Sequence, residues 1–209
     1  ESSAASDVYK RQRLVRRGQW QGWHPTHMLS TQVTGKTLGL IGMGSIGSRF
    51  AQQARRGFGM KIQYVSRSEV PADRIAGLDA QRVSLEQLFA TSDFVSLHCP
   101  ATEATRHLVD AAALDLMPEH SQLINTARGP IVDEQALAVA LAAGKIAGAG
   151  LDVYEREPVV HRGLLELEQV VLLPHMGSGA IETREAMGMK VVDNLQAFFA
   201  GERPPDLVA

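Results

Sequence analysis

Residues 37–47 read Thr-Leu-Gly-Leu-Ile-Gly-Met-Gly-Ser-Ile-Gly, and this stretch decides the fold. The apolar run 37–41 predicts a short buried strand, and the helical spacing of apolar residues over 46–58 predicts a helix directly after it. Between them, Gly42, Gly44 and Gly47 form the pattern G-x-G-x-x-G. The pattern is weak evidence by itself, but in a turn from strand to helix it indicates a dinucleotide-binding loop.

Each of the three glycines has a physical reason to be there. Gly42 permits the tight turn, Gly44 leaves room for a pyrophosphate to approach the backbone, and Gly47 lets the helix pack closely on the strand. The free N–H groups and the positive dipole end of the helix then favour the phosphates. A glycine-rich loop with a purely structural role is the alternative, and the strand–turn–helix context disfavours it.

The alternation of strands and helices continues along the chain. Further apolar runs of strand length lie at 61–65, 94–97, 122–126, 147–153 and 170–173. Strands that are apolar on both faces and alternate with helices predict repeated βαβ units in a parallel sheet. We therefore expect an α/β fold, a Rossmann-type doubly wound sheet of six or seven strands with helices on both faces and the order 3-2-1-4-5-6 at its core.

Several residues mark the expected helix ends. Ser84 and Gln87 have the spacing of a capping box, Asp110 and Asp133 stand where N-caps belong, and Gly144 follows the helix 133–143. The last expected helix covers 182–200. Its apolar residues predict one buried face, and they are Val191, Val192, Leu195, Phe198 and Phe199.

Composition excludes several classes of protein. The chain has 209 residues, 44% hydrophobic and 21% charged, which is typical of a globular protein that needs neither disulfides nor a structural metal. A formal net charge of −2 argues against nucleic-acid binding, because phosphate binding draws on excess cations. No apolar run is long enough to span a membrane. The single cysteine, Cys99, excludes an internal disulfide and fits a cytoplasmic location.

The residues after the second expected strand bear on the choice of cofactor. An acidic side chain there would bind the ribose 2′-hydroxyl of NAD(H), but the chain has Ser66-Arg67-Ser68 instead, and Glu69 follows later. A cation with two hydroxyls suits a 2′-phosphate, which favours NADP(H). If Arg67 is merely an exposed residue, NAD(H) stays open as the cofactor.

Three other segments, at 125–129, 150–158 and 173–177, each follow an expected strand and can converge on one crevice. Arg128 offers a planar fork of donors for a carboxylate or carbonyl. His175 can exchange a proton with a substrate oxygen, and Glu157 beside it would orient the ring. Asp152 could bind a nicotinamide carboxamide. Each residue alone is more often structural, but the set is hard to explain without a shared site.

These segments, with residues 39–47 and His98-Cys99-Pro100, resemble the NAD(P)-dependent D-isomer-specific 2-hydroxyacid dehydrogenases. The resemblance runs from about residue 13 to 205. The short distance from Glu157 to His175, the lead-in around Trp20–Trp23 and Ser66-Arg67-Ser68 are most similar to the glyoxylate/hydroxypyruvate reductase branch. Two alternatives stay open: a dehydrogenase for another substrate such as phosphoglycerate, and a dinucleotide-sensing, corepressor-like binding module.

The resemblance implies reduction of a small 2-oxo acid by hydride from NADPH, with Arg128 on the substrate, Glu157 on His175, and His175 as general acid/base. It also implies a set of cofactor contacts. These are Gly42, Gly44, Ser45, Ile46 and Gly47 at the pyrophosphate, Ser66, Arg67 and Ser68 at the 2′-phosphate, Cys99, Pro100 and Thr105 beside the adenosine, and Thr126, Ala127, Asp152 and Gly177, with Arg128 and His175, at the nicotinamide end.

The resemblance further implies a domain organisation. It predicts a lead-in helix and an arm reaching a partner in a homodimer at 13–36, the Rossmann domain at 37–180, and, at 181–209, a helix that returns toward an N-terminal substrate domain absent from this sequence. Residues 1–12 are polar and without a pattern, and they are interpreted as a disordered or non-native tail. Because closure of a two-domain cleft completes such sites, we expect this fragment to bind cofactor but to turn over poorly or not at all. The basic run Lys10–Arg17 is interpreted as a solvated helix face rather than a nucleic-acid patch.

Overall fold

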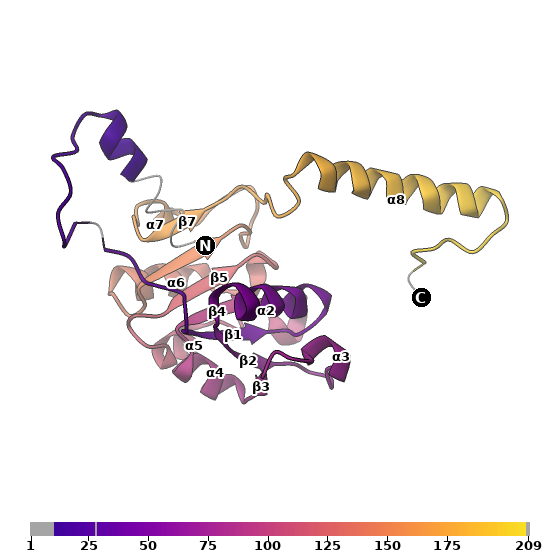
Figure 1. The fold of residues 1–209 in the computed structure, drawn as a ribbon, viewed down its shortest axis with the longest axis horizontal. Helices are drawn as coiled ribbons and strands as arrows, with labels where there is room; N and C mark the ends of the chain where they lie inside the picture. The colour runs from indigo at the N-terminus through magenta and orange to yellow at the C-terminus, as the bar shows by residue number, and fades with distance from the viewer. Residues whose placement is uncertain (1–10, 28, 208–209) are drawn as a thin grey trace. The chain divides into compact units, whose positions relative to one another are not determined.

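The structure is a computed structural model that describes residues 11–27 and 29–207, so most of the expected tail lies outside the described residues. Residues 11–16 are helical, and 18–27 and 29–36 form no regular helix or strand. The strands that follow are β1 (Thr37–Ile41), β2 (Lys61–Val65), β3 (Gln81–Arg82), β4 (Phe94–Leu97), β5 (Gln122–Asn125), β6 (Gly148–Leu151) and β7 (Val170–Leu172) (Figure 1).

Helices connect the strands. They are α2 (Ser45–Phe58), α3 (Ala72–Ile75), α4 (Leu85–Thr91), α5 (Ala111–Leu116), α6 (Glu134–Ala142), α7 (Arg162–Leu165) and α8 (Ile181–Phe199), with the 3-10 turns η1 (Glu103–Thr105) and η2 (Gly129–Ile131). The predicted bounds of six strands agree with these within two residues. The two-residue strand β3 was not predicted.

The strands form one seven-stranded sheet in the order β3-β2-β1-β4-β5-β6-β7, and every pair is parallel. The predicted order is therefore confirmed, with β7 added at one edge. Because β1 pairs with β2 on one side and β4 on the other, the direction of winding reverses there. The carboxyl ends of parallel strands lie at one edge of the sheet, and in open α/β sheets such a reversal marks the crevice where ligands bind.

The sheet carries a hydrophobic cluster on each face, as expected from the period of two along a strand. Leu38 and Leu40 of β1 pack with α2, whereas Ile41 packs with α4, α5 and α6. The same alternation places Phe94 of β4 in the first cluster, which contains Leu38 and Leu40, and Val95 in the second cluster, which contains Ile41. Both faces of the sheet are thus buried, which is why its strands are almost continuously apolar.

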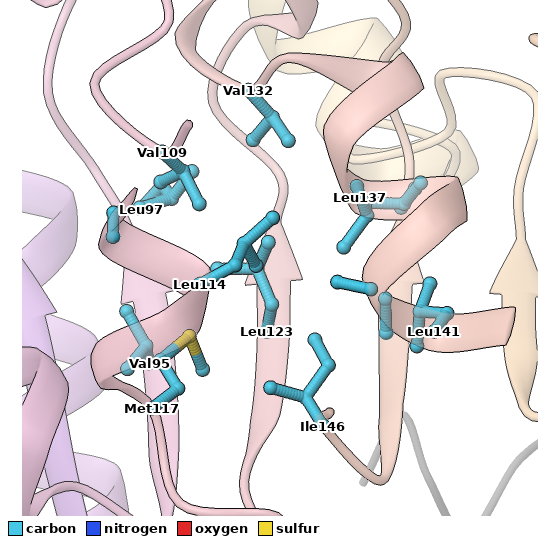
Figure 2. Packing of buried hydrophobic residues seen from close by; sticks show 14 of the residues in the cluster. Val95, Leu97, Val109, Leu114, Met117, Leu123, Val132, Leu137, Leu141 and Ile146 are labelled. Carbon is cyan, nitrogen blue, oxygen red and sulfur yellow. The ribbon is translucent and has the colours of Figure 1, made fainter. Parts of the chain in front are cut away.

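Figure 2 shows the second cluster. Leu123 of β5 lies between side chains of α5 and α6, among them Leu114, Leu137 and Leu141. Each of these four residues is at most 1% exposed. At about 25 cal/mol per Å² of apolar surface, a buried leucine contributes roughly 2 kcal/mol, so this cluster holds the ends of β4, β5 and β6 in a fixed geometry.

Most of the predicted helix ends are confirmed. The side chains of Ser84, Asp110 and Asp133 accept hydrogen bonds from the backbone N–H groups of Gln87, Ala113 and Ala136. For Ser84, this hydrogen bond is one of the two that the predicted capping box would contain. Gly144 follows α6 with φ +69°, in the left-handed region that a glycine at this position adopts freely.

The chain divides between His175 and Met176 into two compact units. In the second unit, Lys190 and Asn194 of α8 bind the carboxylate of Asp206, so the residues after the helix fold back on it. The prediction of a buried face on this helix is wrong for the structure: α8 buries no residue, and Phe199 is 81% exposed. Helical spacing identifies an apolar face but not what covers it. None of the helices in the described part of the chain meets the length and apolarity of a membrane span.

Candidate active site

The turn after β1 has the geometry that a dinucleotide pyrophosphate requires. Gly42 has φ +101°, and a Cβ there would lie 2.7 Å from the carbonyl group of His98. A Cβ on Gly47 would overlap the carbonyl oxygen of Gly42, so the helix lies directly on the turn. Gly44 is different, because a Cβ there would meet no atom within 4 Å. The open space in front of Gly44 fits the approach of a ligand rather than internal packing.

Helix α2 begins immediately behind this space. Gly44 is its N-cap, and the N–H of Ser48 is bonded to the Gly44 carbonyl at 2.9 Å. The first N–H groups of a helix, here those of Ser45, Ile46 and Gly47, have no intrahelical acceptor. The first turn carries no acidic residue that would repel an anion. These residues fit the pyrophosphate of a dinucleotide.

Ser66, Arg67 and Ser68 follow β2 at the same edge of the sheet, and Arg67 and Ser68 are exposed. The structure adds Arg82 of β3, whose guanidinium donates to the Ser66 carbonyl at 2.8 Å. Sequence analysis missed Arg82 because β3 is too short to predict. Two cations, Arg67 and Arg82, therefore come from the strands at this end of the crevice.

On the other side of the turn, the residues expected near the adenosine lie after β4. The backbone of His98 and Cys99 contacts Gly42, as the space around that glycine shows. Burial raises the pKa of the Cys99 thiol, which agrees with a backbone rather than a thiol role. The Thr105 hydroxyl donates to the Pro100 carbonyl at 2.7 Å and accepts from the Thr102 N–H at 2.8 Å. Thr105 thus shapes the loop that Pro100 begins.

The loop after β5 presents Thr126, Ala127 and Arg128 at the crevice. It is held by Asn125, which is 1% exposed. The Asn125 amide donates to the Arg128 carbonyl at 2.9 Å and accepts from the Ala127 N–H at 3.1 Å. Asn125 is thus a positioning residue, a role that its place at the end of an apolar run does not reveal. Arg128 is exposed, and its guanidinium donates to the Ala127 carbonyl at 2.6 Å.

Glu157 and His175 form a pair in the structure. Oε2 of Glu157 lies 2.8 Å from Nδ1 of His175, and Oε1 accepts from the Tyr154 N–H at 3.0 Å. The hydrogen bond to His175 and then that to Tyr154 lower the pKa of Glu157; slight burial opposes them, and the charges of His175 and Arg128 assist. Glu157 is therefore a carboxylate at neutral pH, and Arg128 is near enough to act on it.

Tyr154 connects the two strands that supply this pair. Its hydroxyl donates to the Leu173 carbonyl at 2.8 Å, two residues before His175. Burial, followed by the charges of Asp152, Glu134 and Glu157, raises the pKa of Tyr154, so the hydroxyl stays a donor. Beside the pair lies a cavity of about 270 Å³, lined by Tyr154, Glu157, Pro158, Val160, Leu172, Leu173, Pro174 and His175.

Three positions complete the expected set. His175 has φ +55°, a left-handed conformation that side chains rarely adopt and that is found at functional sites. Asp152 directly follows β6 and is 4% exposed, and its N–H donates to the Asn125 carbonyl at 3.0 Å. Gly177 belongs to the second unit, Met176–Ala209. The described residues contain no cluster of three histidine, cysteine or acidic side chains able to hold a metal.

Comparison with known proteins agrees with this geometry. The family model of the D-isomer specific 2-hydroxyacid dehydrogenase NAD binding domain matches residues 2–177. The chain is 46% identical over 210 residues to a glyoxylate reductase of Thermococcus litoralis, covering 99% of this chain and 63% of that protein. A glyoxylate reductase of Korarchaeum cryptofilum is 48% identical over 208 residues, with 99% of this chain and 62% of that protein covered.

Among solved structures, an NADPH-dependent glyoxylate/hydroxypyruvate reductase of Sinorhizobium meliloti superposes with a TM-score of 0.85 at 38% identity, covering 97% of this chain and 62% of that one. The chain thus spans about three fifths of the length of these relatives. The matched family segment contains the glycine turn, Arg128, Glu157 and His175. The chain belongs to the D-isomer specific 2-hydroxyacid dehydrogenase family through its NAD binding domain.

Proposed function

We propose that this chain is the cofactor-binding and proton-transferring part of an NADPH-dependent reductase that converts glyoxylate or hydroxypyruvate to the 2-hydroxy acid. The observation that carries the proposal is the 2.8 Å contact between Glu157 and His175 at the sheet edge that also carries the glycine turn. The names of the curated relatives support a small 2-oxo acid as substrate.

The nicotinamide cofactor supplies the hydride when it is bound, and the protein supplies position, charge and a proton. Nδ1 of His175 faces Glu157, which leaves Nε2 to hydrogen-bond to the substrate's carbonyl oxygen. As that oxygen becomes an alkoxide, Nε2 gives it a proton, and the Glu157 carboxylate stabilises the imidazolium form before transfer. The His175 side chain is 51% exposed, so a substrate can reach it.

Arg128 binds the substrate's carboxylate end. Its guanidinium is a planar fork of donors that matches a carboxylate. The hydrogen bond from the Asn125 amide to the Arg128 carbonyl holds its backbone, and the 2.6 Å contact with the Ala127 carbonyl holds one of its terminal nitrogens. Substrate and proton donor are thereby held by loops at one edge of the sheet, those after β5 and β7, and such positioning lowers a reaction barrier.

The preference for NADPH rests on the end of β2. No carboxylate occupies the position that would bind a ribose 2′-hydroxyl, and Ser66-Arg67-Ser68 stands there with Arg82 beside it. Binding of a 2′-phosphate by a cation and hydroxyls is a charge-assisted interaction. The solved reductase of Sinorhizobium meliloti is NADPH-dependent by name, which supports the same choice here.

Calorimetric titration of this chain with NADPH and NADH tests the cofactor preference. NADPH should bind at least about tenfold more tightly, since a charged hydrogen bond is worth roughly 1.5–3 kcal/mol. Arg67→Ala should remove most of that difference and leave NADH binding unchanged. Arg56→Ala, an equal change of charge at the C-terminal end of α2, is the matched control. Tighter binding of NADH by the unaltered chain would contradict the proposal.

Reductase activity is tested on the full-length protein that contains this chain. Consumption of NADPH with glyoxylate, hydroxypyruvate and bulkier 2-oxo acids would be compared through kcat/KM. Higher kcat/KM for the two small acids would support the proposal, and a preference for a bulky 2-oxo acid would overturn the substrate assignment. Cofactor binding without turnover of any 2-oxo acid would favour a binding module instead.

We also propose that the whole protein is a homodimer. The segment 18–36 carries Trp20 and Trp23, which are 56% and 84% exposed. Exposed tryptophans close together in the chain suit a surface that is covered in an assembly. Sedimentation velocity over a range of concentrations measures the state, and a monomer throughout would contradict the proposal.

A further inference from the structure

Glu134 is a buried acidic residue that the proposed reaction does not use. It is the first residue of α6 and is only 5% exposed. A buried carboxylate is costly unless hydrogen bonds satisfy it. The hydrogen-bond partners of Glu134 therefore indicate its structural role.

Both carboxylate oxygens of Glu134 accept hydrogen bonds from the main chain of one distant segment. Oε1 accepts from the N–H of Glu155 at 2.7 Å, and Oε2 accepts from the N–H of His161 at 3.2 Å. These two N–H groups stand at the two ends of residues 155–161. Glu157, the partner of His175, lies between them.

The other contacts of this segment are placed mainly at its two ends. Gly129 has no room for a Cβ because the carbonyl of Tyr154 lies against it, and the Glu155 side chain hydrogen-bonds to Nε2 of His107. At the far end, Nε2 of His161 contacts the Gln135 side chain at 3.0 Å. Within the segment, the Val159 N–H donates to the Arg156 carbonyl at 2.8 Å. Among these contacts, only Glu134 joins the two ends through one side chain.

We propose that Glu134 is a positioning residue, whose carboxylate clamps residues 155–161 at both ends and so holds Glu157 at Nδ1 of His175. The placement of Glu157 can be tested on this chain alone, whereas the effect on turnover rests on the proposed reductase function. A side chain that fixes both ends of a short loop restricts the loop far more than either bond alone. Misplacing a catalytic group by about 1 Å can cost on the order of 100-fold in rate.

A simpler role for Glu134 is to stabilise α6, since a negative charge in the first turn interacts favourably with the helix dipole. Two substitutions separate the roles. Glu134→Gln keeps the length and turns one acceptor into a donor that faces an N–H group. Glu134→Asp keeps the charge at the helix start but is one methylene too short to span both N–H groups. Gln135→Ala is the matched control, because it removes a neighbouring contact to the same segment through the His161 side chain only.

The first measurement follows the carboxyl carbon of Glu157 by NMR during a pH titration of this chain. In the unaltered chain the pKa of Glu157 lies below its ordinary value because of its hydrogen bonds to His175 and Tyr154. We expect both Glu134 variants to move it back toward about 4.3, and Gln135→Ala to leave it in place. Thermal unfolding of each variant verifies that it is folded. If Glu134→Gln does not fold, the titration of Glu134→Asp decides the test.

The second measurement compares kcat and KM in the full-length protein. Both Glu134 variants should lower kcat about 10- to 100-fold, with KM and the Kd of NADPH within about twofold. A Glu157 titration that stays unchanged in a folded Glu134 variant would overturn the inference, as would a Glu134→Asp variant that matches the unaltered protein. If the full-length protein reduces no 2-oxo acid, the proposed function fails, and the NMR titration still decides the placement of Glu157.

Discussion

Nδ1 of His175 lies 2.8 Å from Oε2 of Glu157, although 18 residues separate them in the chain. The two residues follow β6 and β7, which are neighbours in the parallel sheet with Leu151 opposite Leu172. Parallel pairing brings the carboxyl ends of both strands to one edge, so the loops that follow them meet there. The pair is therefore formed within the first unit, Glu1–His175.

Glu157→Gln should lower the kcat of the full-length protein by about 100-fold. Glutamine can still accept a hydrogen bond from Nδ1 of His175, but it carries no charge to stabilise the imidazolium. The Kd of NADPH should change little. Steady-state kinetics measure the effect, with Glu166→Gln at the exposed end of α7 as a control for the same chemical change. A kcat within about twofold of the unaltered protein would rule out the assigned role.

The hydrogen bond between Glu157 and His175 should also make the stability of the site depend on pH. The hydrogen bond from His175 holds the pKa of Glu157 below its usual value. The stability from this bond is therefore fully present above the ordinary glutamate pKa of about 4.3, and it is lost as pH falls through the lower pKa of the folded chain. NMR titration of the Glu157 carboxyl in His175→Gln should show a higher pKa than in the unaltered chain. Equal values would show that the two side chains do not interact in solution.

Arg128→Lys should raise the KM for a 2-oxo acid about 10- to 100-fold, because an ammonium cannot form the two parallel hydrogen bonds that a guanidinium offers a carboxylate. The Kd of NADPH should change much less. Measurement of KM and of cofactor binding on the same preparation separates the two effects. If both change equally, Arg128 acts on the cofactor rather than on the substrate.

Much of this site could be predicted from sequence because the signals are local. The glycine turn, the strand before it and the helix after it lie within 22 consecutive residues, Thr37–Phe58, and each carries its own pattern. The positions of Arg128, Glu157 and His175 followed from the rule that ligands bind at the carboxyl ends of parallel strands. The structure brings Glu157 and His175 into hydrogen-bond contact as that rule predicts.

The supporting residues could not be predicted because their roles depend on contacts between distant segments. Glu134 binds the N–H of Glu155, 21 residues away, and Tyr154 binds the carbonyl of Leu173, 19 residues away. A glutamate at the start of a helix and a tyrosine after a strand are ordinary in sequence. Only the fold shows that both hold the loops that carry Glu157 and His175.

The glycines of the turn should respond to substitution in different ways. Gly44→Ala places a methyl group in open space, so the free energy of unfolding should stay within about 0.5 kcal/mol while NADPH binds at least about tenfold more weakly. Gly47→Ala places a methyl group against the Gly42 carbonyl. It should weaken NADPH binding and also destabilise the fold by about 1–3 kcal/mol.

Gly57→Ala is the control for this comparison, because Gly57 lies inside α2, where a Cβ would meet no atom within 4 Å. It should stabilise the chain by about 0.5–1 kcal/mol without changing cofactor affinity. Urea unfolding and calorimetric titration of the three variants give both quantities. Gly44→Ala with undiminished NADPH affinity would contradict the placement of the pyrophosphate.

His98 should make the fold sensitive to mild acid. Burial lowers its pKa to about 4, and its ring lies against Phe50 with Nε2 3.0 Å from the Ser96 hydroxyl. An unfolded histidine has a pKa of about 6.5, so below that pH the unfolded chain binds a proton that the folded chain does not. The free energy of unfolding should therefore be unaffected above about pH 6.5 and fall as pH drops toward 4, by about 2 kcal/mol at pH 5.

Urea unfolding at about pH 7.5 and about pH 5 measures this loss, and His98→Asn should reduce it by about 2 kcal/mol because asparagine does not titrate. Asp and Glu residues contribute equally to both proteins, so their effect cancels in the difference. His27→Asn, at an exposed position of the lead-in, is the matched control and should leave the loss unchanged. If His98→Asn and the unaltered chain lose the same stability between the two pH values, His98 is not held neutral by its surroundings at the edge of the crevice.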